Sequence, residues 1–337
     1  MCRSRYASGG TSELRRGDGT RNVPATLASP QVGAILNRMN IGQAYVNGAW
    51  LPASELSIPV GDLGFVLGVT VVERLRTFNG RPFRTEEHLT RLHRSLEIVG
   101  WDAAAIITQV RGALSAFPDL NAELMTPGDD WNIAAFVTPG ATVDAAQPTV
   151  CVHGGPIPFA AWAHKFETGV EVCITDIRQT PANCWPPELK CRSRMHYYLA
   201  DQEAARRRPG ARALLLDQRG FIGEASTANV VAYYKDRGLV TPRLDGVLPG
   251  ISQQFLFEIA DELGVPHSEA DILPAELADD DEAFLTSTSI CIQPVVRQDD
   301  KPIGDGTPGP VYRQLLAAWS KKVGVDIAAQ AKQFANR

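Results

Sequence analysis

The chain has 337 residues, which is enough for one large domain or two ordinary domains with a substantial buried core. Its 33 Lys and Arg against 38 Asp and Glu give a net charge of -5, and no stretch is basic enough to follow a phosphate backbone, so we expect no nucleic-acid partner. The six cysteines lack metal-ligand spacing, and no apolar run has the length of a membrane span. We therefore expect no metal, no membrane association and a cytoplasmic location with reduced thiols.

Composition divides the chain into five segments. Residues 1–38 are rich in Arg, Gly, Ser and Thr without apolar periodicity, and we predict a disordered extension there. We expect a smaller N-terminal α+β domain over 39–153 and a larger C-terminal domain over 170–325. Between them, 154–169 contains Gly-Gly and two prolines, which is typical of an interdomain loop. A C-terminal tail is expected over 326–337.

The N-terminal domain is expected to begin with hairpin turns and an amphipathic helix. Asn47-Gly48 and Asn79-Gly80 each lie between short apolar runs, which is the strongest short-range signal for a tight β-hairpin. Thr85 is the predicted N-cap of a helix, because two acidic residues follow it and apolar residues then recur at helical spacing. A second helix over about 107–117 and strands over 131–138 and 149–153 are expected next.

The C-terminal domain alternates strand-like and helix-like segments. Strands are expected over 170–175, 213–217, 229–234 and 282–286, and helices over 194–207, 252–263 and 309–322. Gly264 followed by Pro266 ends the second of these helices. Because the connections at 218–220 and 235–238 are short, we expect mixed, largely antiparallel sheets. The predicted fold class is α/β of the mixed α+β type.

Four segments contain chemically useful side chains, although each alone is most simply a surface or turn feature. Lys190 follows a proline-rich segment just ahead of a helix, and most lysines are solvated. Glu224 is the single acid of a turn-like segment of small and hydroxyl residues. The segment 248–252 opens a helix, whose N-terminus suits a phosphate. The segment 286–289 ends a strand with several hydroxyls, which are also common in capped turns.

Taken in order, these segments resemble the class IV aminotransferases, the family of branched-chain and D-amino-acid aminotransferases and aminodeoxychorismate lyase. The resemblance covers nearly everything from Tyr45 to Tyr312. The matching segments are 62–68 leading into 73–76, 87–95, Lys190 with 203–204, Glu224 with Asn229, 239–242 with 250–252, and 286–295. The resemblance implies the two-domain class IV fold, pyridoxal 5'-phosphate (PLP) as the cofactor, amino acid and 2-oxo acid substrates, and a homodimer.

By this resemblance, Lys190 in the C-terminal domain is the catalytic residue. It would form a Schiff base with PLP and then carry a proton to and from the substrate, a role that needs an amine of lowered pKa. Glu224 matches the acid that faces the pyridine nitrogen and keeps it protonated. Without the resemblance, Glu224 is most simply a carboxylate in a turn.

The resemblance also implies a phosphate site for the cofactor. Arg91 matches the arginine that binds the phosphate from the first amphipathic helix, since its planar fork donates two hydrogen bonds to one phosphate. Ile251 and Ser252 at a helix N-terminus and Thr288 would assist it. Without the resemblance, Arg91 is a solvated helix charge.

Substrate recognition departs from the family pattern. Arg76 corresponds to an arginine near the substrate carboxylate of branched-chain enzymes, with Arg192 and Arg194 as rivals and Ser289 as a further candidate. The strand ending at 136–140 lacks the arginine and histidine pair with which D-amino-acid aminotransferases bind the carboxylate. We therefore expect a branched-chain-like L-amino acid as donor.

Three other functions remain open at this point. Aminodeoxychorismate lyase uses the same lysine and cofactor to release pyruvate, and the segments 189–199 and 240–245 look somewhat lyase-like. A non-catalytic family member would retain the fold without the chemistry, although the joint presence of Arg91, Lys190, Glu224 and Thr288 argues against it. A Rossmann-type dehydrogenase is disfavoured because no GxGxxG follows a strand.

Overall fold

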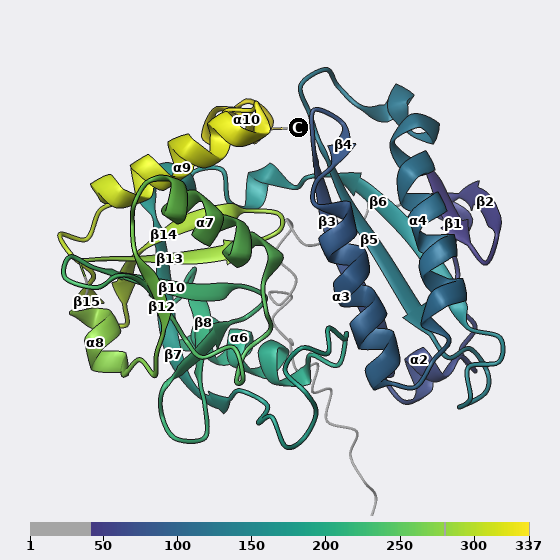
Figure 1. The fold of residues 1–337 in the computed structure, drawn as a ribbon, viewed down its shortest axis with the longest axis horizontal. Helices are drawn as coiled ribbons and strands as arrows, with labels where there is room; N and C mark the ends of the chain where they lie inside the picture. The colour runs from purple at the N-terminus through teal and green to yellow at the C-terminus, as the bar shows by residue number, and fades with distance from the viewer. Residues whose placement is uncertain (1–41, 280, 337) are drawn as a thin grey trace, which may run out of the picture.

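The computed structural model describes residues 42–279 and 281–336, so the extension predicted for 1–38 lies outside the described residues. The chain forms two β-sheets with helices packed on them, and the N-terminal and C-terminal sheets lie side by side (Figure 1). This confirms the mixed α/β class. The bounds of the two expected domains stay predictions. Within the described ranges, no helix combines the length and the apolar character that crossing a bilayer requires.

The N-terminal sheet has six antiparallel strands in the order β2-β1-β6-β5-β3-β4. They are β1 Gln43–Val46, β2 Ala49–Pro52, β3 Val71–Phe78, β4 Arg81–Pro82, β5 Trp131–Thr138 and β6 Thr149–Pro156. The predicted turns at Asn47-Gly48 and Asn79-Gly80 are confirmed, because Val46 pairs with Ala49 and Phe78 with Arg81. Each turn residue has positive φ, as a tight hairpin turn requires.

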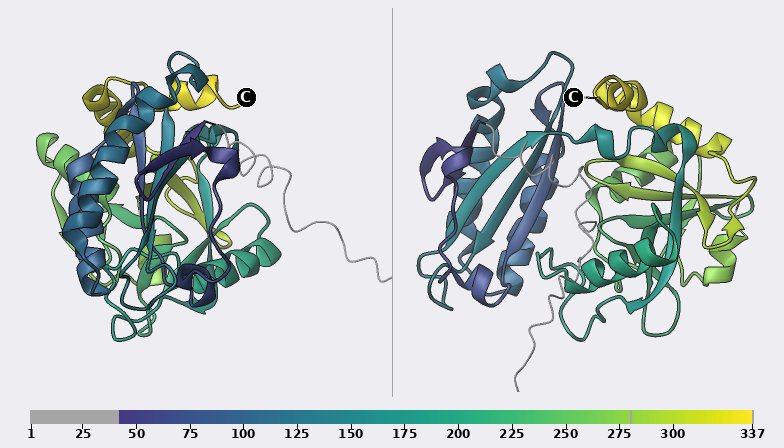
Figure 2. Two further views of the ribbon diagram at one scale, coloured as in Figure 1. Left: turned by 90° about the vertical axis from the view of Figure 1, so that its right-hand side faces the viewer. Right: turned by 180° about the vertical axis from the view of Figure 1, so that it is seen from behind.

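Two long helices, α3 Thr85–Ile98 and α4 Ala103–Leu120, cover one face of this sheet (Figures 1 and 2). Shorter elements are η1 Ala53–Glu55, α2 Leu63–Val66 and η2 Ala122–Leu124. The predicted N-cap of α3 was wrong: Arg84 in the left-handed region is the N-cap, and Thr85 Oγ1 donates to the Pro82 C=O instead. Apolar residues of α3 and α4 pack on β3, β5 and β6, which forms the N-terminal core.

The C-terminal sheet has nine strands, mixed parallel and antiparallel, in the order β12-β11-β10-β13-β14-β7-β8-β9, with β15 paired to β14. They are β7 Val170–Arg178, β8 Arg212–Leu216, β9 Ile222–Ala225, β10 Asn229–Tyr234, β11 Gly238–Thr241, β12 His267–Glu269, β13 Glu282–Ser287, β14 Cys291–Gln298 and β15 Lys301–Pro302. The helices of this part are η3 Phe159–Ala161, α5 Lys165–Thr168, α6 Met195–Arg207, α7 Ile251–Glu262, α8 Pro274–Ala278, α9 Pro310–Val323 and α10 Ile327–Gln333.

The helices α7, α9 and α10 gather on one face of the C-terminal sheet around a large aromatic core, whereas α6 packs on β7 and β8 (Figure 1). Two segments differ from expectation. Strand β6 continues to Pro156, so the expected interdomain loop starts later than residue 154. The segment expected as a C-terminal tail contains α10, whose Ile327 and Ala331 are buried in the core.

Candidate active site

The backbone of Lys190 is fixed by the N-terminal part of the chain. Lys190 lies in the connection between β7 and α6. Its C=O accepts a hydrogen bond from the Val72 N–H of β3 at 3.0 Å, and its N–H donates to Ser95 Oγ of α3 at 3.1 Å. An isolated β-bridge between Val71 and Cys191 extends this contact. Lys190 is therefore held where the two sheets meet.

The Lys190 side chain is half-buried among charged groups. Burial first, and then the positive charge of Arg91, lower the pKa of Lys190 to about 7. Arg194 lowers it further, while Glu73 and Glu224 oppose the shift. The structure thus brings both Arg91 and Glu224 within electrostatic reach of Lys190. An amine of this pKa is substantially neutral near pH 7 and can act as a nucleophile.

Glu224 is buried inside strand β9, not in the turn that its small neighbours suggested. The Tyr197 hydroxyl of α6 donates to one carboxyl oxygen at 2.7 Å, and the Leu248 N–H donates to the other. Burial raises the pKa of Glu224, although these two hydrogen bonds oppose it. A fixed carboxyl of raised pKa suits the sharing of a proton with a ring nitrogen.

Arg91 is held by a buried carboxylate. Its Nε and one terminal nitrogen donate to the two carboxyl oxygens of Glu73 at 2.7 and 2.9 Å, and its other terminal nitrogen donates to the Pro249 C=O at 2.9 Å. His88 Nδ1 lies 2.7 Å from Glu73 Oε2. Although burial alone raises the pKa of Glu73, Arg91 and His88 hold it far below its ordinary value. Glu73 therefore stays ionised and orients the guanidinium, whose further N–H donors remain for a ligand.

The N-terminus of α7 lies beside Arg91. It begins at Ile251 after the N-cap Gly250, and no side chain caps it, so the first N–H groups, including that of Ser252, lack a side-chain partner. A Cβ at Gly250 would come within 2.0 Å of Asn229 Oδ1, so this close approach requires glycine. Such a helix N-terminus next to a guanidinium is suited to bind a phosphate group.

The hydroxyl residues at the end of β13 lie close to this helix. Thr286 pairs in register with Asn229 of β10, and its hydroxyl is buried without a hydrogen-bond partner among the described residues. Thr288 and Ser289 follow in the half-buried turn between β13 and β14. Because a buried hydroxyl without a partner is costly, Thr286 indicates a place where a bound molecule completes the hydrogen bonding.

These residues fit PLP. The free Thr286 hydroxyl, the uncapped N-terminus of α7 and the Arg91 guanidinium match a phosphate, and the buried Glu224 carboxyl matches a pyridine nitrogen. The Lys190 amine matches an aldehyde carbon. By contrast, the described residues contain no group of three or more His, Cys, Asp and Glu side chains placed to bind a metal ion.

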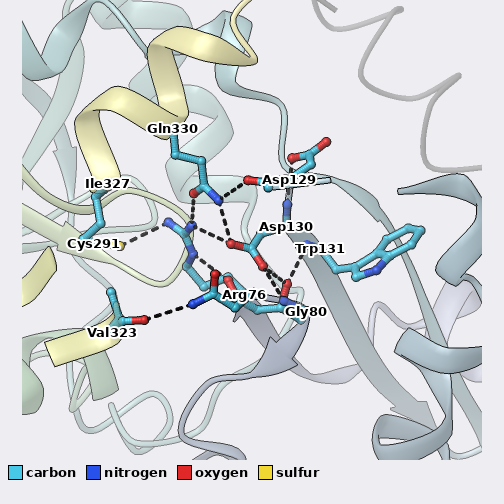
Figure 3. A network of polar contacts seen from close by, with 12 residues as sticks. Arg76, Gly80, Asp129, Asp130, Trp131, Cys291, Val323, Ile327 and Gln330 are labelled. Carbon is cyan, nitrogen blue, oxygen red and sulfur yellow. Dashed lines mark hydrogen bonds and ion pairs between the residues drawn. The ribbon is translucent and has the colours of Figure 1, made fainter. Parts of the chain in front are cut away.

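Arg76 lies in a separate polar network (Figure 3). Its side chain is 1% exposed and donates to Gln330 Oε1 at 2.9 Å and to the Ser289 C=O and Cys291 Sγ at 3.2 Å each, with Asp130 Oδ2 at 3.9 Å. These contacts join β3 to α10 and to the turn before β14. The geometry favours this structural role for Arg76 over the expected contact with a substrate carboxylate.

Three functional candidates were not assigned a role from the sequence. Glu73 fixes Arg91, Tyr197 fixes Glu224, and Arg74 lies near Arg192 and Arg194, the other expected substrate residues. The signal for Glu73 and Arg74 was their charge within a strand that also contains four apolar residues. No local pattern distinguishes Tyr197 from its neighbours on α6.

Comparison with known proteins identifies the family of this chain. The family described as Amino-transferase class IV matches residues 70–297. The chain is 30% identical over 270 residues to the probable branched-chain-amino-acid aminotransferase of Thermotoga maritima, covering 80% of this chain and 92% of the relative. It is 24% identical to the D-alanine aminotransferase of Bacillus licheniformis, covering 82% of this chain and 95% of the relative.

Two further matches concern a longer relative and the fold. Identity is 27% to the branched-chain-amino-acid aminotransferase-like protein 2 of Arabidopsis thaliana, covering 88% of this chain but only 52% of that protein. The crystal structure of the T.th. branched-chain amino acid aminotransferase with pyridoxamine 5'-phosphate superposes with a TM-score of 0.75 at 23% identity, covering 85% of this chain and 95% of the other. The chain belongs to the class IV aminotransferase family.

Proposed function

We propose that this enzyme transfers an amino group between an amino acid and a 2-oxo acid, with Lys190 as the residue that binds PLP. The observation that carries the proposal is the half-buried Lys190 amine, whose pKa of about 7 arises beside Arg91 and Glu224. A solvated lysine has a pKa of about 10.4 and is almost fully protonated at neutral pH, so it is a poor nucleophile. With a pKa of about 7, a substantial fraction of Lys190 is neutral at pH 7 and can act as a nucleophile.

Each neighbouring residue has a separate task in this proposal. When bound, PLP supplies an electron-withdrawing ring that stabilises negative charge at the substrate α-carbon. Arg91, the first N–H groups of α7 and Thr288 hold the phosphate, and Glu224 holds a proton at the pyridine nitrogen. The neutral Lys190 amine moves the proton at the substrate α-carbon, which is general acid and base catalysis.

The test is an absorption spectrum of protein incubated with PLP and dialysed, for wild type, Lys190→Ala and Lys165→Ala. Lys165 is a matched control, because it is also half-buried and burial lowers its pKa too. We expect a visible band in wild type and Lys165→Ala, no such band in Lys190→Ala, and a loss of turnover by roughly 10²–10⁴-fold or more in Lys190→Ala alone. An equal band in all three proteins, or none in any, contradicts the proposal.

A substrate panel distinguishes the alternatives. Bleaching of the band by an amino acid, and its return with a 2-oxo acid, is expected of an aminotransferase. Release of pyruvate without a 2-oxo acid acceptor is expected of the lyase alternative. Both enantiomers belong in the panel, since the preference for a branched-chain-like L-amino acid stays a prediction and D-alanine aminotransferases are among the relatives.

We further propose a homodimer in the cytoplasm, as the family resemblance and the cysteine pattern predict. The support from the fold is an exposed apolar surface next to the active site, which we name the α2–α6 patch. It consists of Phe65, Val66, Leu67, Met195, Tyr198 and Leu199. Its two segments are joined by a hydrogen bond of 2.7 Å from Ser193 Oγ to the Gly68 C=O. Exposed large apolar side chains on two adjoining segments suit a protein interface.

A further inference from the structure

Three arginines lie close to one another on the two segments that adjoin Lys190, and none of them forms an ion pair with a described acidic residue. Arg74 is on β3, and Arg192 and Arg194 follow Lys190 along the chain. The Arg192 N–H donates to the Thr70 C=O at 2.9 Å, which places the segment after Lys190 against the start of β3. The three side chains thus come from two segments that the backbone holds together.

The side of β3 that carries Arg74 faces away from α3. Alternate strand residues point to opposite faces, and Glu73 and Leu75 contact α3. Arg74 therefore shares the other face of the N-terminal sheet, where Arg192 stacks over the Phe136 ring at 5.0 Å. His153 of β6 belongs to the same face, since it pairs with Ala134, which in turn pairs with Arg74.

The positive charges on this face are not balanced. Burial, followed by the charges of Arg192 and Arg194, lowers the pKa of Arg74 to about 10, and burial together with Arg192 and Arg74 lowers that of His153 to about 4. Among residues 42–279 and 281–336, none of the three arginines forms an ion pair with a carboxylate. Within the described part of the chain, the hydrogen bond of the Arg194 side chain goes to the Cys191 C=O at 3.3 Å, which carries no full charge.

Arg194 connects this surplus of positive charge to the active site. Arg194 lowers the pKa of Lys190 and also acts on Glu224, so its charge reaches both groups. Arg91, in contrast, already has Glu73 as its counter-charge. A substrate with one carboxylate would therefore leave most of the positive charge of the cluster uncompensated. A substrate with a second anionic group would balance it, and arginine forks suit carboxylates because they bind both oxygens.

We propose that Arg74, Arg192 and Arg194 form an anion subsite that selects substrates bearing a second carboxylate over branched aliphatic ones. This rests on the proposed function, and it replaces the branched-chain preference expected from the sequence with an acidic amino acid or 2-oxo acid. The assignment depends on this cluster of three guanidiniums, which have no carboxylate partner among the described residues and which reach the Lys190 amine through Arg194.

The experiment compares two unreactive acids of five and six carbons, glutarate and 4-methylvalerate, by calorimetric titration of the PLP-loaded protein and of the protein without PLP. The variants are Arg74→Gln, Arg194→Gln and Arg192→Gln, with Arg81→Gln as the matched control, because Arg81 is exposed on the distant β4 hairpin. Arg192 is itself exposed, so its replacement tests the subsite even where the half-buried positions disturb folding.

In wild type and Arg81→Gln, glutarate is expected to bind at least tenfold more tightly than 4-methylvalerate. Each subsite variant should weaken glutarate at least tenfold and leave 4-methylvalerate within about twofold. The half-reaction with glutamate and aspartate, against leucine, should follow the same order. Equal or tighter binding of 4-methylvalerate by wild type overturns the subsite.

The two proposals fail in different ways. Protein that takes up PLP but prefers 4-methylvalerate and leucine would refute the subsite and retain the aminotransferase. Protein that binds glutarate through these arginines but never takes up PLP would refute the aminotransferase and retain the subsite.

Discussion

The surroundings of Lys190 disfavour the positive charge of its amine. Keeping the charged amine in this place therefore lowers the free energy of unfolding. Burial, then Arg91 and Arg194, bring its pKa down to about 7 from an ordinary value of 10.5. Between these two values the unfolded chain binds more protons than the folded chain, so stability rises with pH across this window. At and below about pH 7 the full penalty applies, and above about pH 10.5 it vanishes.

Replacing Lys190 by methionine should therefore stabilise the protein without PLP. At pH 7, we expect Lys190→Met to raise the free energy of unfolding by about 0.5–2 kcal/mol, the range of common stabilising substitutions. The gain should shrink as pH rises toward 10. Thermal unfolding at several pH values measures it, with Lys301→Met as the control because Lys301 is exposed. A lower Tm for Lys190→Met at pH 7 would show that the amine is not held against its charge.

The residues that orient the expected active-site groups could not be predicted from local pattern. The order of motifs along the chain singled out Lys190, Glu224 and Arg91, because each lies in a recognisable segment. Their partners Glu73 and Tyr197 are 18 and 27 positions away from Arg91 and Glu224, respectively. Such pairs depend on how a helix packs on a strand, and periodicity contains no information about that.

Helix α10 links the C-terminal part of the molecule to the N-terminal part through the hydrogen bonds of Gln330. The Nε2 group of its Gln330 donates to the Gly128 C=O at 2.9 Å and to Asp130 Oδ2 at 2.7 Å, while its Oε1 accepts from Arg76 at 2.9 Å (Figure 3). These partners belong to the N-terminal part. Because the side chains of Arg76, Asp130 and Gln330 are all buried, breaking any of these hydrogen bonds would leave a buried polar group without a partner.

The substitution Gln330→Ala should therefore destabilise the protein by about 2–4 kcal/mol, since it removes two buried hydrogen bonds and one partly buried one, including the hydrogen bond from Arg76. Gln333→Ala is the matched control, because Gln333 is on the same helix but exposed. Chemical denaturation of both variants gives the difference in free energy of unfolding. If the free energies of unfolding of the two variants differ by less than about 0.5 kcal/mol, the hydrogen bonds of Gln330 do not stabilise the contact between the two parts.

Element bounds were predictable where local chemistry decides them. The strands at 131–138 and 229–234 agree with β5 and β10, and Gly264 follows α7 with positive φ as a stop signal should. The N-cap of α3 was not predictable, because Arg84 in the left-handed region is set by the preceding hairpin. Glu224 looked like a turn residue because only the pairing of β9 with β8 defines its strand.

At the scale of the whole molecule, exposed apolar side chains lie on segments that adjoin the candidate active site. The α2–α6 patch lies on the two segments that flank Lys190 and Arg194 in space, namely the residues before β3 and the start of α6. Its Phe65 and Met195 side chains are 72% and 69% exposed. Burial of such side chains against a second copy of the chain would contribute roughly 1.5–3 kcal/mol each and would cover the open side of the site.

Sedimentation equilibrium should therefore give twice the chain mass of 36.5 kDa for wild type at micromolar concentration. Phe65→Asp and Met195→Asp place a charge at the two most exposed side chains of the patch, so each should shift the equilibrium toward the monomer by at least tenfold in Kd. Leu120→Asp is the matched control, because Leu120 is also exposed but ends α4, away from the patch. A dimer that persists in both patch variants would place the interface elsewhere, and a wild-type monomer would exclude the homodimer. Since the patch adjoins Lys190, loss of the dimer should also weaken PLP retention on dialysis, which links the assembly of the molecule to its chemistry.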